Sequence, residues 1–459
     1  MRELPEEPLG KATGMLMPRI RALLRPGLGL KRWLALLILG MALFSLGVAF
    51  TTEVSISPRI LPALRALTLG ELPPLARGGV FILIGTALGG VAAYQTYRWV
   101  VLGTSQRHGR DDILTAMDIK RRRDHGPRIV AIGGGTGLST LLRGLKYQTG
   151  NLTAIVTIAD DGGSSGRLRA DLHMPPPGDA RNCLVALSES EPLMEELFDH
   201  RFQGSSSLNG HSLGNLLLAA LYEMRGGFQE SLEAAAQLLA LSGRVVPVSN
   251  ASGLVLMGET VSGQVLRGES AIGHAPDGLS RVWIESEGAV ASEAALEAIR
   301  EAEMIVIGPG SLYTSIIPNF LLPGVCEAVT ASPAPKVFVC NVATQPHETD
   351  GYSVLEHLRA FQAHSGVSVT HVLVNSNVLT LPEEWGQVAV PPIFRIQGFE
   401  GAVVLADVVD EGFPTRHDPR KLASALLSIG RSSSNGMRKT LSSKAAAPQP
   451  VAMMGKAKE

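Results

Sequence analysis

The sequence predicts an α/β protein built on a doubly wound, mostly parallel sheet, preceded by two transmembrane helices. Two observations lead to this prediction. From Arg128 onward, short apolar runs alternate with helical patterns, and uninterrupted apolar runs are typical of strands buried on both faces of a parallel sheet. Before Arg128, two uncharged apolar stretches each approach the ~20 residues that a helix needs to cross a bilayer. With 459 residues, the chain is long enough for two or three folded units.

The composition argues against several classes of protein. Lys and Arg total 41 against 42 for Asp and Glu, so no charge excess favours nucleic acid. Aromatic residues do not interleave with basic ones, as they do in binders of single-stranded nucleic acid. The cysteines Cys183, Cys326 and Cys340 form no CxxC pair, and their odd number argues against a disulfide framework. We therefore expect no nucleic-acid partner, no resident metal site, and reduced thiols in the cytosol.

The two uncharged apolar stretches are Trp33–Phe50 and Gly78–Tyr97, and the transmembrane helices expected from them cover residues 33–52 and 78–102. A cleaved signal peptide is the alternative for the first stretch, but its apolar region is too long and a second stretch follows. Buried core helices are the alternative for both. Lys and Arg number seven in residues 1–32, three in the connector 53–77 and eight in residues 98–128. Because positive charge collects on the cytoplasmic side, we expect a two-pass protein of the cytoplasmic membrane, with both termini in the cytoplasm.

The rest of the chain divides into a linker, one folded domain and a tail. Residues 103–127 are expected to form a basic linker, and residues 128–430 the α/β domain. The tail 431–459 is rich in Ser, Ala and Pro and is expected to be disordered. Residues 253–270 alternate in polarity and are spaced by glycines, which indicates a β-hairpin insertion within the domain.

Inside the domain, strands and helices alternate along the chain, which is the pattern of a doubly wound sheet. The first two strands and the helix between them form a βαβ unit of normal length. The expected strands are 128–132, 153–159, 244–248, 304–308, 336–340, 369–375 and 402–408. The expected helices are 136–147, 215–224, 230–242, 291–302 and 353–364.

The first strand runs into the turn GGGTG (133–137), which also opens a helix. Glycines allow a phosphate to approach the backbone, and the free N–H groups of a helix N-terminus favour an anion. The spacing is not the dinucleotide fingerprint GxGxxG, because Leu138 stands where its last glycine would be, and it is not GxxxxGK[ST] either. A tight turn without a ligand is the alternative. The binding candidates here are Gly134, Gly135, Thr136 and Gly137.

A second polar turn, DDGGSSGRLR (160–169), follows the second strand. Ligands of open α/β sheets bind at this edge. The carboxylates could bind hydroxyl groups or a hydrated Mg²⁺ ion, the serines could form an anion-binding nest, and the arginines could clamp a phosphate. A solvated loop is the alternative. The candidates here are Asp160, Asp161, Ser164, Ser165 and Arg167.

Four more polar segments supply candidates. PPPGDARN (175–182) has an acid at a helix start, where a helix N-cap is the alternative. NGHSLGN (209–215) puts a histidine and an asparagine four residues apart at a helix entrance, where a structural histidine is the alternative. GPGSLYTS (308–315) and NVATQPHETDGYS (341–353) follow strands. Because at least four strands end in polar turns, we expect a lined crevice at one edge of the sheet. The candidates are Asp179, Arg181, Asn182, His211, Asn215, Gly310, Ser311, Tyr313, Asn341, Thr344 and Gln345.

The domain contains, in this order, the motifs AIGGGTGLSTLLRGLK, DDGGSSGRLR, PPGDARN, GHSLGNL, GPGSLYTS and NVATQPHETDGYS. Together they resemble the motifs of the bacterial gluconeogenesis-factor (YvcK) family. That family belongs to the CofD-like superfamily, whose enzymatic relative is 2-phospho-L-lactate transferase. The resemblance covers roughly residues 128–427; His347 departs from it, because glycine is usual there. The family typically has no membrane spans, so residues 1–127 look like an added anchor, which some bacterial relatives share.

The resemblance implies a Rossmann-like core that binds a nucleotide sugar, with UDP-N-acetylglucosamine as the ligand. It also implies a role in cell shape and wall synthesis during growth on gluconeogenic carbon sources. We expect cell-wall synthesis proteins as partners, and a homo-oligomer. On the transferase side, Asp160 or Asp161 and Arg181 match residues of the acceptor pocket.

Two enzymatic alternatives stay open beside a nucleotide-sugar-binding regulator. One is a Mg²⁺-dependent, phospholactate-type transferase that acts on a nucleotide-linked substrate. The other is a nicotinamide-dependent oxidoreductase, which the broken GxGxxG fingerprint disfavours. We expect a binding protein rather than an enzyme, with no catalytic residue assigned and Mg²⁺ as the one cofactor that the acids could accept.

Overall fold

The computed structural model describes residues 30–51, 72–103, 123–189, 191–205 and 207–430. The chain divides into two compact units, one over residues 1–120 and the other over residues 121–459. The tail and most of the predicted N-terminal segment, connector and linker lie outside the described residues.

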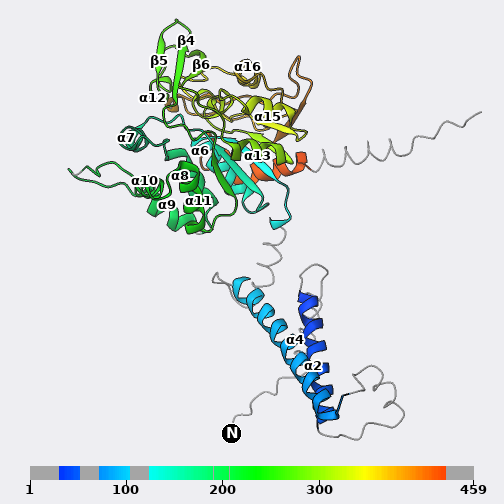
Figure 1. The fold of residues 1–459 in the computed structure, drawn as a ribbon. Helices are drawn as coiled ribbons and strands as arrows, with labels where there is room; N and C mark the ends of the chain where they lie inside the picture. Colours follow the sequence, from blue (N-terminus) through cyan, green and yellow to red (C-terminus); the bar gives the residue numbers. More distant parts are fainter. Residues whose placement is uncertain (1–29, 52–71, 104–122, 190, 206, 431–459) are drawn as a thin grey trace, which may run out of the picture. The chain divides into compact units, whose positions relative to one another are not determined.

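The first unit contains two long helices, α2 (Leu30–Thr51) and α4 (Pro74–Gly103) (Figure 1). Within α4, Leu75–Gln95 are long and apolar enough to cross a membrane, whereas Ala35–Thr51 of α2 form a shorter apolar helix. Both predicted apolar stretches are therefore helical, and one of them meets the length and hydropathy of a membrane span.

Glycines bring α2 and α4 into backbone contact. A Cβ atom at Gly85 would lie 2.5 Å from the backbone nitrogen of Phe44, and one at Gly47 would lie 2.7 Å from that of Ile82. A Cβ atom at Gly90 would meet nothing within 4 Å. Gly85 therefore packs between the two helices, as small residues do in membrane helix pairs, whereas Gly90 does not.

The second unit is built on a seven-stranded parallel sheet with the order β10-β9-β8-β7-β1-β2-β3. From β1, which lies beside the middle strand β7, the chain moves outward through β2 and β3, then returns to the other side of β1 for β7. This doubly wound order puts a topological switch point between β1 and β7. The strands are β1 (Ile129–Gly133), β2 (Leu152–Val156), β3 (Arg244–Pro247), β7 (Met304–Ile307), β8 (Lys336–Val339), β9 (His371–Asn375) and β10 (Ala402–Ala406).

The central strands are buried on both faces, since every residue of β1, β7 and β8 is buried. Burial on both faces explains why these strands read as uninterrupted apolar runs. The helices of this unit include α6 (Gly135–Leu145), α7 (Gly163–Leu172), α8 (Gly178–Leu187), α9 (Glu191–Asp199), α10 (Leu213–Arg225), α11 (Phe228–Leu239), α13 (Glu293–Glu301), α14 (Ile317–Phe320), α15 (Val325–Ala331) and α16 (Val354–Ser365).

The predicted hairpin insertion is larger than the sequence indicated. β4 (Val255–Thr260) pairs antiparallel with β5 (Val265–Arg267), as expected, but also with a third strand, β6 (Leu279–Glu285). A short helix, α12 (Glu269–Ile272), joins β5 to β6. β6 escaped prediction because its burial pattern does not alternate strictly, so its sequence lacks the period of two that marks a half-buried strand.

Several helices were also not predicted, among them α7 and α9. α7 occupies most of the DDGGSSGRLR segment, for which we expected a nest or a solvated loop, and α9 lies in a segment without any assignment. Glycine and serine disfavour a helix, but Ser164 and Ser165 of α7 are buried and hydrogen-bonded to neighbouring helices. Tertiary contacts therefore outweigh the weak local preference of α7.

Candidate ligand-binding site

A cavity of about 350 Å³ opens at the carboxyl ends of β1, β7 and β8. β1 and β7 are neighbours in the sheet, with Ile132 paired to Ile307, although they are far apart in the sequence. The cavity therefore lies at the topological switch point, where open α/β sheets bind their ligands. Its size is within the range of small-molecule sites, roughly 300–1,000 Å³.

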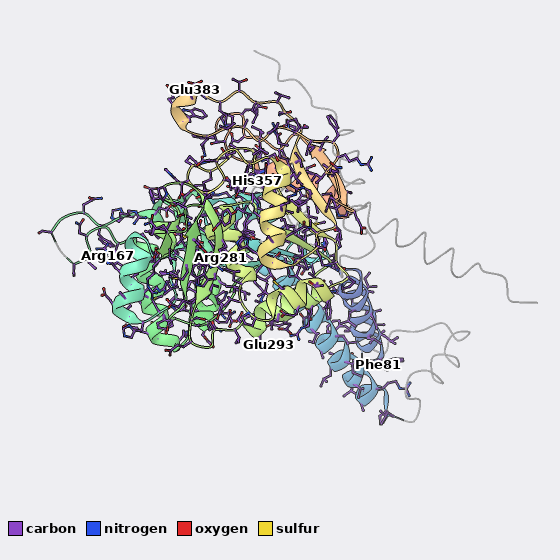
Figure 2. All side chains as sticks on the ribbon, turned by 90° about the horizontal axis from the view of Figure 1, so that it is seen from above. Phe81, Arg167, Arg281, Glu293, His357 and Glu383 are labelled. Atoms are coloured by element: carbon purple, nitrogen blue, oxygen red, sulfur yellow. The ribbon has the colours of Figure 1, made fainter. Side chains whose placement is uncertain are left out.

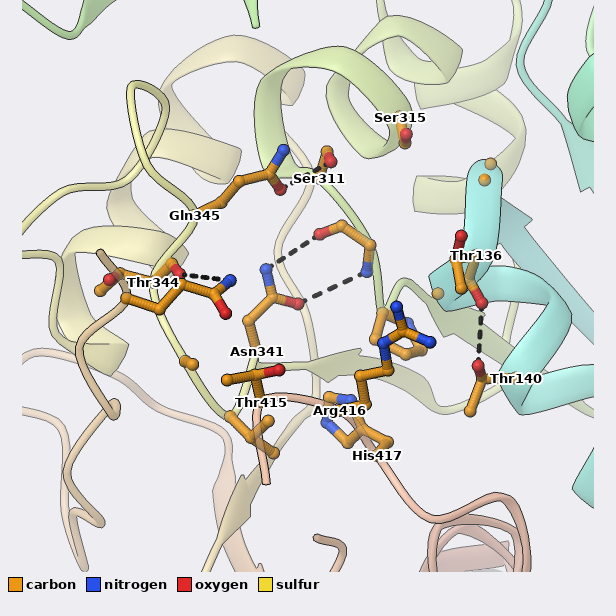
Figure 3. Close-up of a pocket in the computed structure, with 18 of the residues that line it drawn as sticks. Thr136, Thr140, Ser311, Ser315, Asn341, Thr344, Gln345, Thr415, Arg416 and His417 are labelled. Carbon is orange, nitrogen blue, oxygen red and sulfur yellow. Dashed lines mark hydrogen bonds between the residues drawn. The ribbon is translucent and has the colours of Figure 1, made fainter. Parts of the chain in front are cut away.

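The glycine turn after β1 forms one wall and opens α6. Gly135 has a φ of 60°, a left-handed conformation that favours glycine. A Cβ atom at Gly137 would lie 2.4 Å from the carbonyl oxygen of Pro309, so only glycine allows the turns after β1 and β7 to meet. Thr136 accepts a hydrogen bond from Thr140 Oγ1 at 2.9 Å (Figure 3).

The turns after β7 and β8 form the facing wall and are bonded to each other. Asn341 Nδ2 donates to the carbonyl of Gly310 at 3.0 Å, and Asn341 Oδ1 accepts from the N–H of Gly310 at 3.4 Å (Figure 3). Ser311 Oγ donates to Gln345 Oε1 at 2.6 Å. These side chains present amide and hydroxyl groups whose remaining hydrogen-bonding capacity suits a polar ligand.

Behind this wall, the buried Glu348 holds the two turns together. Its carboxylate accepts hydrogen bonds from Thr314 Oγ1 at 2.9 Å, from the N–H of Tyr313 at 3.2 Å and from Gln345 Nε2 at 2.8 Å. Burial raises the pKa of Glu348 to about 7, although the bonds from Thr314 and Tyr313 lower it. Tyr313, a predicted ligand residue, is 2% exposed, and its hydroxyl is bonded to Tyr352.

A fourth segment, Thr415–His417, completes the cavity and was not predicted. His417 Nε2 lies 3.2 Å from the carbonyl of Cys340, and burial lowers the pKa of His417 to about 4, so this ring is neutral and donates the bond. Arg416 is exposed and is the only Lys or Arg among the described residues that line the cavity. The cavity therefore has one permanent positive charge.

Two acids also line the cavity, Asp179 at the start of α8 and Glu269 at the start of α12. Burial and the neighbouring Asp160 raise the pKa of Asp179 to about 7, while a hydrogen bond from the Gly135 backbone lowers it. Burial, and then Asp160, raise the pKa of Glu269 to about 8. Asp179 is not the N-cap of α8, because the N-cap is Pro177.

Other candidates form a buried polar network beside the cavity rather than its lining. Ser164 Oγ lies 3.0 Å from His211 Nδ1 and accepts from Asn215 Nδ2 at 3.1 Å. His211 precedes α10, whose N-cap is Ser212, so the predicted pair meets at Ser164 and not along one helix. Burial, followed by the charge of Arg167, lowers the pKa of His211.

Arg181 and Asn182 are likewise engaged within the domain. Arg181 donates to Ser212 Oγ at 2.7 Å and to Asn182 Oδ1 at 2.8 Å, and lies 3.2 Å from a carboxylate oxygen of Asp199. Asp160 Oδ1 accepts from the N–H of Gly162 at 2.9 Å. The contacts of Arg181 with Ser212 and Asp199 tie α8 to α10 and α9, and they give Arg181 a structural role in this conformation.

Half of the predicted site residues line the cavity, and the sequence missed several others. Arg167 is exposed and lies on the outer part of the domain (Figure 2). The candidates that line the cavity are Gly134, Gly135, Thr136, Gly137, Asp179, Gly310, Ser311, Asn341, Thr344 and Gln345. The candidates outside its lining are Asp160, Asp161, Ser164, Ser165, Arg167, Arg181, Asn182, His211, Asn215 and Tyr313. The lining residues that were not candidates are Thr140, Glu269, Pro309, Ser315, Val342, Ala343, Gln387, Thr415, Arg416 and His417.

No group of three or more His, Cys, Asp or Glu side chains in the described part of the chain has the arrangement of a metal site. Mg²⁺ stays a prediction of the sequence.

Comparison with known proteins identifies the family. The profile of the family described as 2-phospho-L-lactate transferase CofD matches residues 129–387, which include the turns after β1, β7 and β8. The gluconeogenesis factor of Bacillus subtilis is 46% identical over 313 residues, which cover 66% of this chain and 98% of that protein. The chain belongs to the gluconeogenesis-factor family of CofD-like proteins.

Two further relatives show how far the similarity to this family extends. A relative from Nostoc sp. is 40% identical over 420 residues, covering 88% of this chain and 91% of that protein. This match is longer than residues 121–459 and therefore extends into the first unit. A crystal structure of a UPF0052-family protein from Bacillus halodurans has a TM-score of 0.62 and 45% identity, and covers 66% of this chain and 99% of its own. The predicted CofD-like fold is thus confirmed.

Proposed function

We propose that the domain binds a nucleotide sugar, UDP-N-acetylglucosamine, in the cavity at the switch point, as a regulator of cell shape and wall synthesis during gluconeogenic growth. The observation that carries this proposal is one cavity lined by a glycine turn at a helix N-terminus, by amide and hydroxyl side chains, and by a single arginine. Arg416 would bind the diphosphate. Asn341, Thr344 and Gln345 would bind the base or the sugar.

Isothermal titration calorimetry of the full chain in detergent with UDP-N-acetylglucosamine tests this proposal. We expect saturable binding with a 1:1 stoichiometry, and no loss of the ligand when the mixture is then analysed by chromatography. ADP-glucose serves as the matched nucleotide-sugar control, and we expect it to bind more weakly. Absence of binding would contradict the proposal.

Consumption of the ligand would instead favour a transferase. The match to the CofD transferase profile over residues 129–387 supports this second candidate, as do the acids Asp179 and Glu269 in the cavity. A Mg²⁺-dependent transferase would release a nucleotide only when Mg²⁺ and an acceptor are present, so the same assay with and without Mg²⁺ separates the two functions.

We further propose that α2 and α4 tether the domain to the cytoplasmic membrane as a two-pass anchor. The apolar stretch Leu75–Gln95 and the close glycine packing of α2 against α4 support a membrane hairpin. The excess of Lys and Arg in residues 1–32 and 98–128 over the connector supports cytoplasmic termini.

Membrane extraction at high pH tests the tether. We expect the full chain to stay in the pellet after carbonate washing at about pH 11, because a spanning hairpin is held by apolar burial and not by charge. The fragment 121–459, which lacks both helices, is the matched control and should be found in the supernatant. Release of the full chain by carbonate would contradict a spanning anchor.

A further inference from the structure

Glu269 reaches the cavity from a part of the chain that is not one of the sheet's own turns. It is the first residue of α12, in the insertion that carries β4, β5 and β6, and its half-buried side chain lines the cavity. All other described lining residues come from segments that follow β1, β7, β8, β9 and β10, or from the start of α8. The insertion therefore contributes one acid to the ligand-binding site.

The backbone on both sides of Glu269 is fixed by Asp161, from the turn after β2. Asp161 Oδ1 accepts hydrogen bonds from the N–H of Ser270 at 2.9 Å and from Ser270 Oγ at 2.8 Å. Gly268 has a φ of 93°, and a Cβ atom there would lie 1.9 Å from Asp161 Oδ2, so the carboxylate packs against this glycine. Asp161 thus holds α12, and with it Glu269, against the edge of the sheet.

Two histidines anchor the insertion at other points. His364 Nε2 on α16 accepts a hydrogen bond from the N–H of Val282 on β6 at 3.1 Å. His347 has a φ of 71° and lies 3.2 Å from the carbonyl of Ala275, just after α12. At residue 347, where the family usually has glycine, the backbone is therefore left-handed, and the side chain of His347 contacts the insertion. These two contacts hold the insertion beyond α12, whereas Asp161 contacts the residues on both sides of Glu269.

The charges around Glu269 limit what it can bind. Asp160, Asp161, Asp179 and Glu348 all act on Glu269 with negative charge. Glu269 and Asp179 offer a phosphate no positive charge, whereas Arg416 offers one elsewhere in the lining. A carboxyl group among other acids is better matched by a neutral hydroxyl group, to which it can hydrogen-bond in either protonation state.

We infer that Glu269 is a specificity residue that binds a hydroxyl group of the nucleotide sugar, and that Asp161 is the residue that positions it. This inference rests on the proposed function. It gives the insertion a role in ligand selection, and it explains why an acid of the second turn contacts the insertion instead of lining the cavity.

The test compares the affinities of variants of the full chain for UDP-N-acetylglucosamine and for UDP by calorimetry. Glu269→Ala should weaken binding of UDP-N-acetylglucosamine about tenfold, the scale of one hydrogen bond to a charged or polar group. Glu269→Gln keeps a hydrogen-bonding group and should retain most of the affinity. Asp161→Asn should give a smaller loss of the same kind. Glu285→Gln, an exposed acid on β6 of the same insertion, is the matched control and should bind as the wild type does.

The two ligands distinguish the source of the hydroxyl group. A loss for UDP-N-acetylglucosamine alone assigns the hydroxyl to the pyranose, and an equal loss for UDP assigns it to the ribose; both support the inference. If the wild type binds and Glu269→Ala binds equally well, with an unchanged melting temperature, the inference fails while the proposed function stands. If the wild type binds neither ligand, both fail.

Discussion

Replacement of Arg416 by alanine is expected to weaken binding of both UDP-N-acetylglucosamine and UDP about 10- to 100-fold, or about 1.5–3 kcal/mol, the scale for a hydrogen bond to a charged group. Arg416 is the one Lys or Arg in the described lining, and the lining also holds two acids. A diphosphate in this cavity would have no other permanent positive charge to offset its own.

The fold should survive this substitution. The N–H of Arg416 donates to the carbonyl of Phe413 at 2.8 Å, and its own carbonyl accepts from the N–H of Asp410 at 3.0 Å, so the backbone of the turn is held without the guanidinium. Arg420→Ala is the matched control, since Arg420 is exposed on the same segment and does not line the cavity. Equal affinities of the two variants, measured by calorimetry, would contradict a phosphate role for Arg416.

Much of the domain fold could be predicted because its strands are buried on both faces. The sequence of such a strand, for example Ile129–Gly133, is an uninterrupted apolar run, which distinguishes it from a loop. The alternation of these runs with helices then indicates a parallel sheet. The elements that were missed depend on contacts rather than on pattern. α7 begins with glycine and serine, and its buried serines are stabilised by Asn215, a residue distant in the sequence.

The candidate site could be predicted only in part, for a related reason. The rule that polar turns after parallel strands meet at one edge correctly indicated the turns after β1, β7 and β8. Applied to the polar segment after the predicted strand 402–408, the same rule would also have indicated Arg416. No local signal marks Glu269, because the insertion reaches the cavity through tertiary contacts with Asp161.

At the turn after β2, the same rule predicted ligand-binding residues that do not line the cavity. Its serines, together with His211 and Asn215, form a buried network that fixes α7 against α10, and its Asp161 contacts the insertion. Polar side chains at the correct edge of a sheet can therefore serve the positioning of neighbouring elements, and density of polar residues alone does not separate this role from ligand contact.

Removal of the Glu348 carboxylate is expected to have the largest effect on stability. Glu348→Ala leaves three donors without their acceptor, the N–H of Tyr313, Thr314 Oγ1 and Gln345 Nε2, and Glu348 itself is 1% exposed. We expect the free energy of unfolding to fall by about 3 kcal/mol, because buried unpaired donors cost about 1–3 kcal/mol each and part of that cost is relieved by rearrangement. Urea denaturation followed by circular dichroism measures this change.

The pH dependence of the same site has a definite sign. Burial raises the pKa of Glu348 to about 7, above the ordinary value of 4.5, so its contribution to stability is present below about pH 4.5 and is lost as the pH rises through 7. Glu348→Gln cannot ionise, so its stability deficit relative to the wild type should shrink between pH 5 and pH 8. Glu356→Gln is the matched control, because hydrogen bonds from Ser353 lower the pKa of Glu356 from its ordinary value of 4.5. Its deficit should therefore stay constant between pH 5 and pH 8 and shrink only at lower pH. A Glu348→Gln deficit that stays constant across this range would show that the carboxyl group keeps one protonation state there, and would contradict a pKa near 7.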